Sequence, residues 1–184
     1  MQETFYELIN YLKNPILEKD ANQDTLYRFQ KFLHLLIISI VTAMVSLALI
    51  GLVDKLELVN LAEDHKAEEL FKSLPKIVVF FLAVILAPLL EETFFRAPLT
   101  AFKKGKQFKI AFYVFAVLFG FVHISNYQIS TNVLLLSPIL VLPQTLLGFY
   151  LGFIRVRFGL LWAMALHAVY NGVFIGASFL GDLM

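Results

Sequence analysis

Two adjacent glutamates, Glu91 and Glu92, lie inside a long apolar stretch, and Arg96 follows four residues after the second of them. A charged side chain in hydrocarbon costs roughly 2.5–3.5 kcal/mol on insertion scales, so three together call for an explanation. Glu92 and Arg96 share one helix face and can form an ion pair that only locks packing. Glu91 lies about 100° around the helix from Glu92 and lacks such a partner, which makes it a candidate general base.

Two later apolar stretches carry polar side chains at the same four-residue spacing: Phe119 with His123, and His167 with Asn171. A single histidine near a helix end is more often a hydrogen-bonded or interfacial residue than a catalytic one. Counted along each helix at 1.5 Å per residue, however, Glu91, His123, His167 and Asn171 all lie roughly 13–24 Å from one membrane surface. We therefore expect four polar groups from three spans to meet in one layer.

A carboxylate, two imidazoles and an amide allow two mechanisms of amide hydrolysis. In the first, Glu91 and His123 activate a water, while His167 and Asn171 donate hydrogen bonds to the developing oxyanion. In the second, Glu91, His123 and His167 bind a divalent metal such as zinc, which acidifies the water. The HExxH pattern of many zinc proteases is absent. The residues leave both mechanisms open.

The composition places these residues in a membrane protein. Of 184 residues, 59% are hydrophobic and only 16% are charged, against about 25% charged in soluble domains. A net charge of +1 gives no electrostatic basis for nucleic-acid binding. Cysteine is absent, which excludes disulfides, thiolate metal ligands and a cysteine nucleophile.

Five stretches are long and apolar enough to cross a bilayer, and we predict an all-α polytopic bundle. The predicted spans cover residues 34–53, 75–100, 108–125, 133–154 and 158–180. Before them, Phe5, Leu8, Ile9 and Leu12 repeat at helical spacing, which predicts an amphipathic helix on the membrane surface or against the bundle. The Asn14-Pro15 pair should end this helix.

Prolines and small residues predict local features of the spans. Pro88 and Pro98 flank the glutamates, so we expect a freed backbone carbonyl or a water site beside Glu91. Small residues recur every four positions in the last two spans, which predicts close helix packing. These small residues are Gly148, Gly152, Ala168, Gly172 and Gly176.

Charge predicts the orientation in the cell membrane. With the N-terminus in the cytoplasm, ten basic residues fall on the inner side and four on the outer side, as the positive-inside rule requires. The charged 54–74 connection then lies outside and carries a short amphipathic pattern formed by Ala67, Leu70, Phe71 and Leu74. An odd number of spans places the C-terminus outside.

Three motifs now stand in order on successive helices: Glu91-Glu92-TFF-Arg96, Phe119-GFV-His123 and His167-AVY-Asn171. They resemble the EExxxR, FxxxH and HxxxN motifs of the CAAX-protease and bacteriocin-processing family, intramembrane endopeptidases that include the type II CAAX prenyl endopeptidases. The resemblance covers about residues 75–180. We divide the chain into an interfacial segment (1–32), a first span with its charged loop (33–74) and a protease-like core (75–184).

The resemblance implies a helical bundle with an intramembrane site that hydrolyses peptide bonds of membrane-associated peptides or proteins. By motif position, Glu91 is similar to the family's water-activating glutamate and His123 to its partner. His167 and Asn171 match oxyanion-stabilising or ligand positions, and Glu92 and Arg96 match a supporting pair. Members have been described both as metalloproteases and as glutamate-dependent enzymes. The chain is shorter than the eukaryotic CAAX endopeptidases, which weighs against a prenylated protein as the substrate; for a bacterial source we favour a small membrane peptide, such as a bacteriocin leader or a signalling precursor.

Two other functions compete with proteolysis. A non-catalytic membrane scaffold or immunity protein could keep the fold and bind a partner, although the intact set of polar residues weighs against it. A transporter or proton-relay subunit also uses intramembrane glutamate and histidine. Five spans without an evident repeat make a stand-alone transporter less attractive.

Overall fold

The computed structural model describes residues 1–60 and 73–181, and within these residues the chain is helical. Five helical segments in this part of the chain are long and apolar enough to cross a membrane. They cover Thr25–Lys55, Lys76–Ala101, Gly105–Asn126, Thr131–Arg157 and Leu160–Gly181. Each contains one predicted span almost completely, so the all-α polytopic fold is confirmed. Three residues of the predicted 67–74 pattern, Ala67, Leu70 and Phe71, lie outside the described residues.

The N-terminal helix α1 (Gln2–Lys13) packs against the bundle, where it contacts α2 (Thr25–Lys55) and α9 (Leu142–Arg157). It ends before Asn14, as the Asn-Pro pair predicts. Leu8 and Tyr11 form its buried face, whereas Phe5, expected on that face, is 43% exposed. Tyr11 can be buried because its hydroxyl donates to the Ile16 carbonyl at 2.7 Å.

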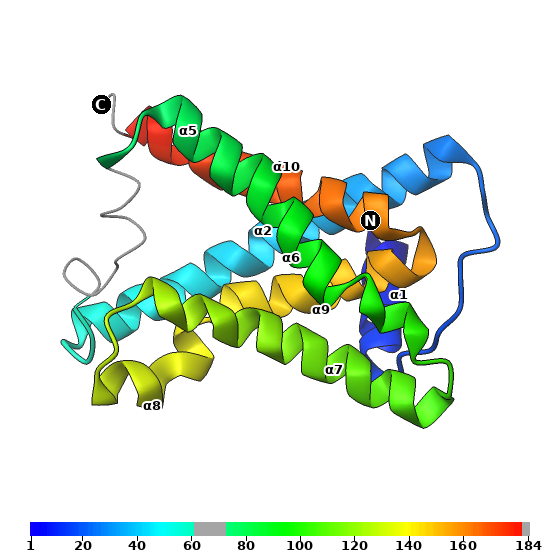
Figure 1. The fold of residues 1–184 in the computed structure, drawn as a ribbon, viewed down its shortest axis with the longest axis horizontal. Coiled ribbons are helices and arrows are strands. Elements are labelled where there is room, and N and C mark those ends of the chain that lie inside the picture. Colours follow the sequence, from blue (N-terminus) through cyan, green and yellow to red (C-terminus); the bar gives the residue numbers. More distant parts are fainter. Residues whose placement is uncertain (61–72, 182–184) are drawn as a thin grey trace.

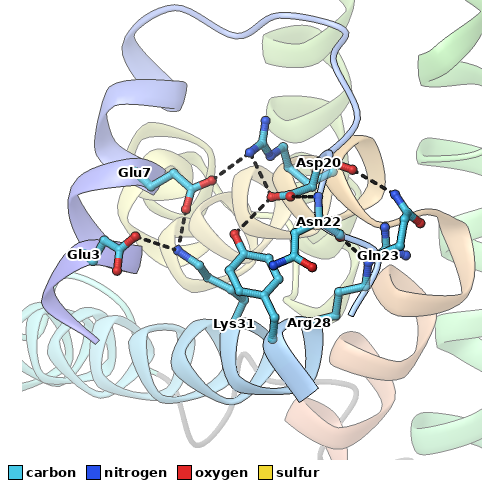
Figure 2. Close-up of polar contacts among 9 residues, drawn as sticks. Glu3, Glu7, Asp20, Asn22, Gln23, Arg28 and Lys31 are labelled. Atoms are coloured by element: carbon cyan, nitrogen blue, oxygen red, sulfur yellow. Dashed lines mark hydrogen bonds and ion pairs between the residues drawn. The ribbon is translucent and has the colours of Figure 1, made fainter. Parts of the chain in front are cut away.

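A cluster of ion pairs fixes α1 and the segment after it to the bundle (Figure 2). Glu7 accepts from Lys31 at 2.7 Å and from Arg157 at 3.1 Å. Arg157 also pairs with Asp20 at 2.9 Å, and the Asp20 main-chain N–H donates to the Arg157 carbonyl. The Asp24 side chain accepts from the Tyr27 N–H and starts α2 ahead of the predicted residue 34.

The second span is divided into four helical pieces. They are α5 (Lys76–Phe80), the π-helix η1 (Phe81–Leu86), α6 (Ala87–Phe95) and the short 3₁₀ helix η2 (Pro98–Ala101). The π-helix lies just before Pro88 and the 3₁₀ helix begins at Pro98. The changes from η1 to α6 and from α6 to η2 therefore each lie beside a proline, which cannot donate the regular α-helical hydrogen bond.

The remaining spans complete the bundle. The third consists of α7 (Gly105–Val122) and η3 (His123–Asn126), the fourth of α8 (Thr131–Leu140) and α9, and the last is α10 (Leu160–Gly181). α8 and α9 are separated at Val141, next to Pro143. Figure 1 shows α5 alongside the C-terminal half of α10, while α7 runs along the opposite side of the bundle. At one end the segment before α2, the η2–α7 turn and the α9–α10 turn come together.

Helices α7 and α9 make the closest packing in the bundle because glycine lets their backbones approach. A Cβ atom at Gly148 would lie 2.9 Å from the Ala116 carbonyl oxygen, and one at Gly152 would lie 2.8 Å from the Phe112 ring. The predicted role of these two glycines is therefore confirmed. The expectation is not met at the two glycines of α10: a Cβ atom at Gly172 would make one ordinary contact, with Val84, and one at Gly176 would reach no packing neighbour within 4 Å.

Candidate active site

The second, third, fourth and fifth spans enclose a cavity of about 420 Å³ in the bundle. Glu91 from α6, His123 from the start of η3, and His167 and Asn171 from α10 all line it. These are the four polar groups that the sequence predicts to meet in one layer. The bundle therefore brings them to one space, with apolar walls that include Phe174.

Glu92 and Arg96 form the predicted ion pair behind this cavity. The Arg96 Nε atom lies 3.4 Å from Glu92 Oε2, and both side chains are almost fully buried. The guanidinium also donates to the Gly148 carbonyl at 3.3 Å and stacks on the Phe119 ring, 4.0 Å from its centroid. Arg96 thus joins the second, third and fourth spans. Removing one member of such a buried pair leaves the other charge uncompensated.

Glu92 has a second partner that the sequence does not reveal. Its Oε1 atom lies 3.0 Å from the Nδ1 atom of His167. The opposite ring nitrogen, Nε2, lies 3.8 Å from Glu91 Oε2. His167 therefore stands between the two glutamates, and Glu92 determines which way its ring faces. Glu92 connects the ion pair to the cavity rather than serving packing alone.

His123 is oriented in a similar way, but by the backbone. Its Nδ1 atom is 2.8 Å from the Phe119 carbonyl oxygen, and its ring packs edge-on against the Phe119 ring. In the neutral state the proton on Nδ1 donates to that carbonyl, which leaves Nε2 as an acceptor. Among the described residues no hydrogen bond or ion pair joins His123 directly to Glu91; the two share the cavity.

Asn171 binds a carbonyl that the π-helix frees. Its side-chain amide donates to the Ala83 carbonyl at 2.8 Å. In an α-helix that carbonyl would accept from Ala87, but the Ala87 N–H instead donates to Leu82, five residues back. In π-helical register its partner would be Pro88, which has no N–H. The freed carbonyl expected near Glu91 is thus that of Ala83.

Two residues that line the cavity each have a polar atom without a hydrogen bond to the described residues. Glu91 Oε2 and Gln144 Oε1 are buried acceptors without a hydrogen bond in this structure, and both residues line the cavity. Unpaired buried acceptors are costly unless water or a ligand donates to them. Gln144 is a candidate substrate-binding residue absent from the predicted set. A lone amide beside Pro143 in an apolar run is the signal that could have identified it.

The donor types of the cavity suit a divalent metal. Glu91, His123 and His167 offer a carboxylate and two imidazoles, and each imidazole has an acceptor at Nδ1, an arrangement common among zinc ligands. In the described part of the chain, however, no three histidine, aspartate or glutamate side chains are placed to hold one ion together. A metal site formed by these three residues stays a prediction.

Comparison with known proteins supplies independent evidence. The family model for "Type II CAAX prenyl endopeptidase Rce1-like" matches residues 73–173, which is more than half of the chain. The chain belongs to this family. The matched region contains all three motifs. No curated protein and no solved structure matches the chain.

Membership in the Rce1-like family agrees with the resemblance drawn from the motifs. It supports a membrane-bound peptidase, and the match covers the second, third and fourth spans and the first part of the fifth. The first span and α1 lie outside the match. Their contacts with α9 and α10 show how the additional segments cover the matched bundle.

Proposed function

We propose that the protein is an intramembrane endopeptidase in which Glu91 activates a water molecule for attack on a peptide bond. The supporting observation is the position of Glu91: its side chain lines the cavity beside His167, and its Oε2 atom accepts no hydrogen bond from the described residues. Glu92, by contrast, forms ion pairs with Arg96 and His167. Of the two adjacent carboxylates, only Glu91 is available to a water in the cavity.

The proposed reaction uses Glu91 as the base and leaves Glu92 in its ion pairs. Glu91 takes a proton from the water, whose oxygen forms a bond to the carbonyl carbon of the substrate. The tetrahedral intermediate then loses its amine as the C–N bond breaks, and Glu91 returns the proton to the leaving nitrogen. The two products are a new carboxyl terminus and a new amine, so atoms and charges balance without a further reactant.

Hydrogen-bond donors must stabilise the oxyanion of the intermediate. Asn171 has a second amide N–H beyond the one given to Ala83, and Gln144 adds an amide group to the same cavity. When the Nδ1–H group of His167 donates to Glu92, a neutral ring carries no proton on Nε2. His167 can therefore donate through Nε2 only in its doubly protonated form. As imidazolium it would pair with both glutamates. His123 Nε2 accepts a hydrogen bond from the attacking water in this scheme.

The size and lining of the cavity suit a short extended segment of a membrane-associated peptide as the substrate. Its volume of about 420 Å³ lies within the range of roughly 300–1,000 Å³ typical of ligand sites. Aromatic and aliphatic side chains form much of the wall, including Phe119, Leu147 and Phe174. A metal bound by Glu91, His123 and His167 would supply the same water activation and is the alternative chemistry.

The test compares membrane peptides from cells that produce the wild-type protein or the Glu91→Gln variant. We expect peptides and new chain termini that are present with the wild type to disappear with Glu91→Gln. Glu18→Gln, at an exposed position outside the cavity, is the matched control and should preserve them. Identical peptide sets for the wild type and Glu91→Gln, at equal protein levels, would refute the proposal and favour a scaffold or relay function.

A further inference from the structure

A second cavity, of about 470 Å³, lies at the end of the bundle where the N-terminal segment meets the α9–α10 turn. Its lining is basic: Lys19, Arg28, Arg155 and Arg157 all contribute. Thr100 of η2 also reaches it. None of these residues lines the catalytic cavity, so this basic cavity is a separate site.

Most of the positive charge in the basic cavity is uncompensated. Arg157 is neutralised by Glu7 and Asp20. Within residues 1–60 and 73–181, no acidic side chain lines the cavity, and no ion pair involves the other three cations. Three positive charges therefore face one space. Such an arrangement favours an anionic ligand.

Two of the guanidinium groups are held in position before any ligand binds. Arg155 donates through Nε to the Arg96 carbonyl at 2.9 Å and through Nη2 to Thr100 at 3.0 Å. Arg28 donates through Nε to the Asn22 carbonyl at 3.0 Å, and its guanidinium lies 5.2 Å from the centroid of the Phe158 ring. Each guanidinium has five N–H donors, so donors remain for a ligand. Fixed side chains lose less entropy on binding.

The position of the basic cavity identifies the anion. It lies where membrane-crossing helices end: α2 begins at Thr25, α9 ends at Arg157 and α10 begins at Leu160. The lysine-rich η2–α7 turn is at the same end. Charges that only set membrane orientation need neither a shared cavity nor fixed guanidinium groups. At the level of the bilayer surface, the abundant anions are phospholipid headgroups.

We propose that the basic cavity binds the phosphate group of an anionic phospholipid. The guanidinium groups of Arg28 and Arg155 and the ammonium group of Lys19 would bind the phosphate oxygens, since arginine and phosphate match in geometry. Arg155 also bonds the main chain of Arg96, so a lipid here contacts the segment that carries the buried Glu92 pair. Bound lipid should consequently stabilise the folded protein. This inference is independent of proteolysis.

The experiment measures lipid binding by the full-length protein in phosphatidylcholine bilayers with and without phosphatidylglycerol. Native mass spectrometry counts the retained lipids, and thermal unfolding reports the stabilisation. We expect phosphatidylglycerol to be retained and to raise the unfolding temperature. The Lys19→Gln/Arg28→Gln variant should bind it at least about tenfold more weakly, because it loses two charge-assisted contacts to the phosphate.

The matched control is Lys103→Gln/Lys104→Gln, which removes the same charge from exposed positions at the same end but outside the basic cavity. It should leave the affinity almost unchanged. A separate arm adds soluble glycerol phosphate to phosphatidylcholine bilayers and should give no stabilisation. Equal losses in the two double variants, equal retention of both lipids, or full stabilisation by glycerol phosphate would each overturn the proposal.

Discussion

The Nδ1 atom of His167 lies 3.0 Å from the Oε1 atom of Glu92. One glutamate of the adjacent pair therefore holds a histidine of the last span in place, and the other glutamate is left to the cavity. The two carboxylates are neighbours in sequence but differ in burial: Glu92 is completely buried, whereas the Glu91 side chain is 29% exposed. This difference in surroundings is the basis for the different roles that we propose for them.

Replacing Arg96 should destabilise the bundle, because Glu92 would keep only His167 as a partner. We expect Arg96→Ala to lower the free energy of unfolding by about 3–5 kcal/mol, the typical cost of breaking a buried ion pair. Thermal unfolding and the yield of folded protein measure this effect. Lys104→Ala, at an exposed position, is the control. If both variants were equally stable, the ion pair would have no structural role.

Replacing Asn171 should destabilise the protein, because its side chain bonds the carbonyl that the π-helix leaves free. Asn171→Ala leaves the Ala83 carbonyl without its donor, at an expected cost of about 1–3 kcal/mol in unfolding free energy. The matched control is Asn132→Ala, which removes a similar amide-to-carbonyl bond, to Leu58, at an exposed position where water can replace it. Similar unfolding temperatures for the two variants would contradict the importance of the freed carbonyl.

Enlarging Gly148 should push α7 and α9 apart. Because a Cβ atom there would lie 2.9 Å from the Ala116 carbonyl oxygen, we expect Gly148→Val to cost about 1–3 kcal/mol of stability. Gly176→Val is the control, since no atom lies within 4 Å of a Cβ atom at that position. Unfolding in detergent measures both variants. A larger loss for Gly176→Val than for Gly148→Val would contradict the packing described for α9.

Removal of metal distinguishes the two ways of activating water. If Glu91 acts alone on the water, treatment with a chelator should leave the cleavage rate of the purified protein unchanged. The measurement pairs this rate with elemental analysis of the protein before and after treatment. A loss of activity that added Zn²⁺ restores would show the metal mechanism, and His123→Ala should then lower the zinc content as well.

Much of the fold could be predicted because the membrane imposes it. Hydrocarbon requires every backbone group to be bonded within a helix, so the length of each apolar run predicts its span. The Glu92–Arg96 ion pair can be predicted because residues four positions apart share one face of a helix. The link between Glu92 and His167 could not be predicted, because it depends on how α6 and α10 pack and rotate. Depth along a helix predicts a layer, but not which atoms meet within it.

The fourth span shows a second limit of the sequence. The prolines of this span predict an interruption of the helix. The end of α8 at Leu140 and the direction of α9, however, depend on contacts with α2 and α7. For this reason the sequence does not predict that Gln144, three residues after the break at Val141, lines the cavity. The membrane orientation also stays a prediction. The clustering of basic segments at one end of the bundle agrees with it.

The most direct test of the central claim is the rate at which the purified, reconstituted protein cleaves a peptide found in the comparison of membrane peptides. We predict that Glu91→Gln lowers this rate by a factor of about 10²–10⁴, the usual contribution of a general base, while its unfolding temperature matches that of the wild type. A Glu91→Gln variant that is equally folded and cleaves at the wild-type rate would contradict the assignment of Glu91 as the base.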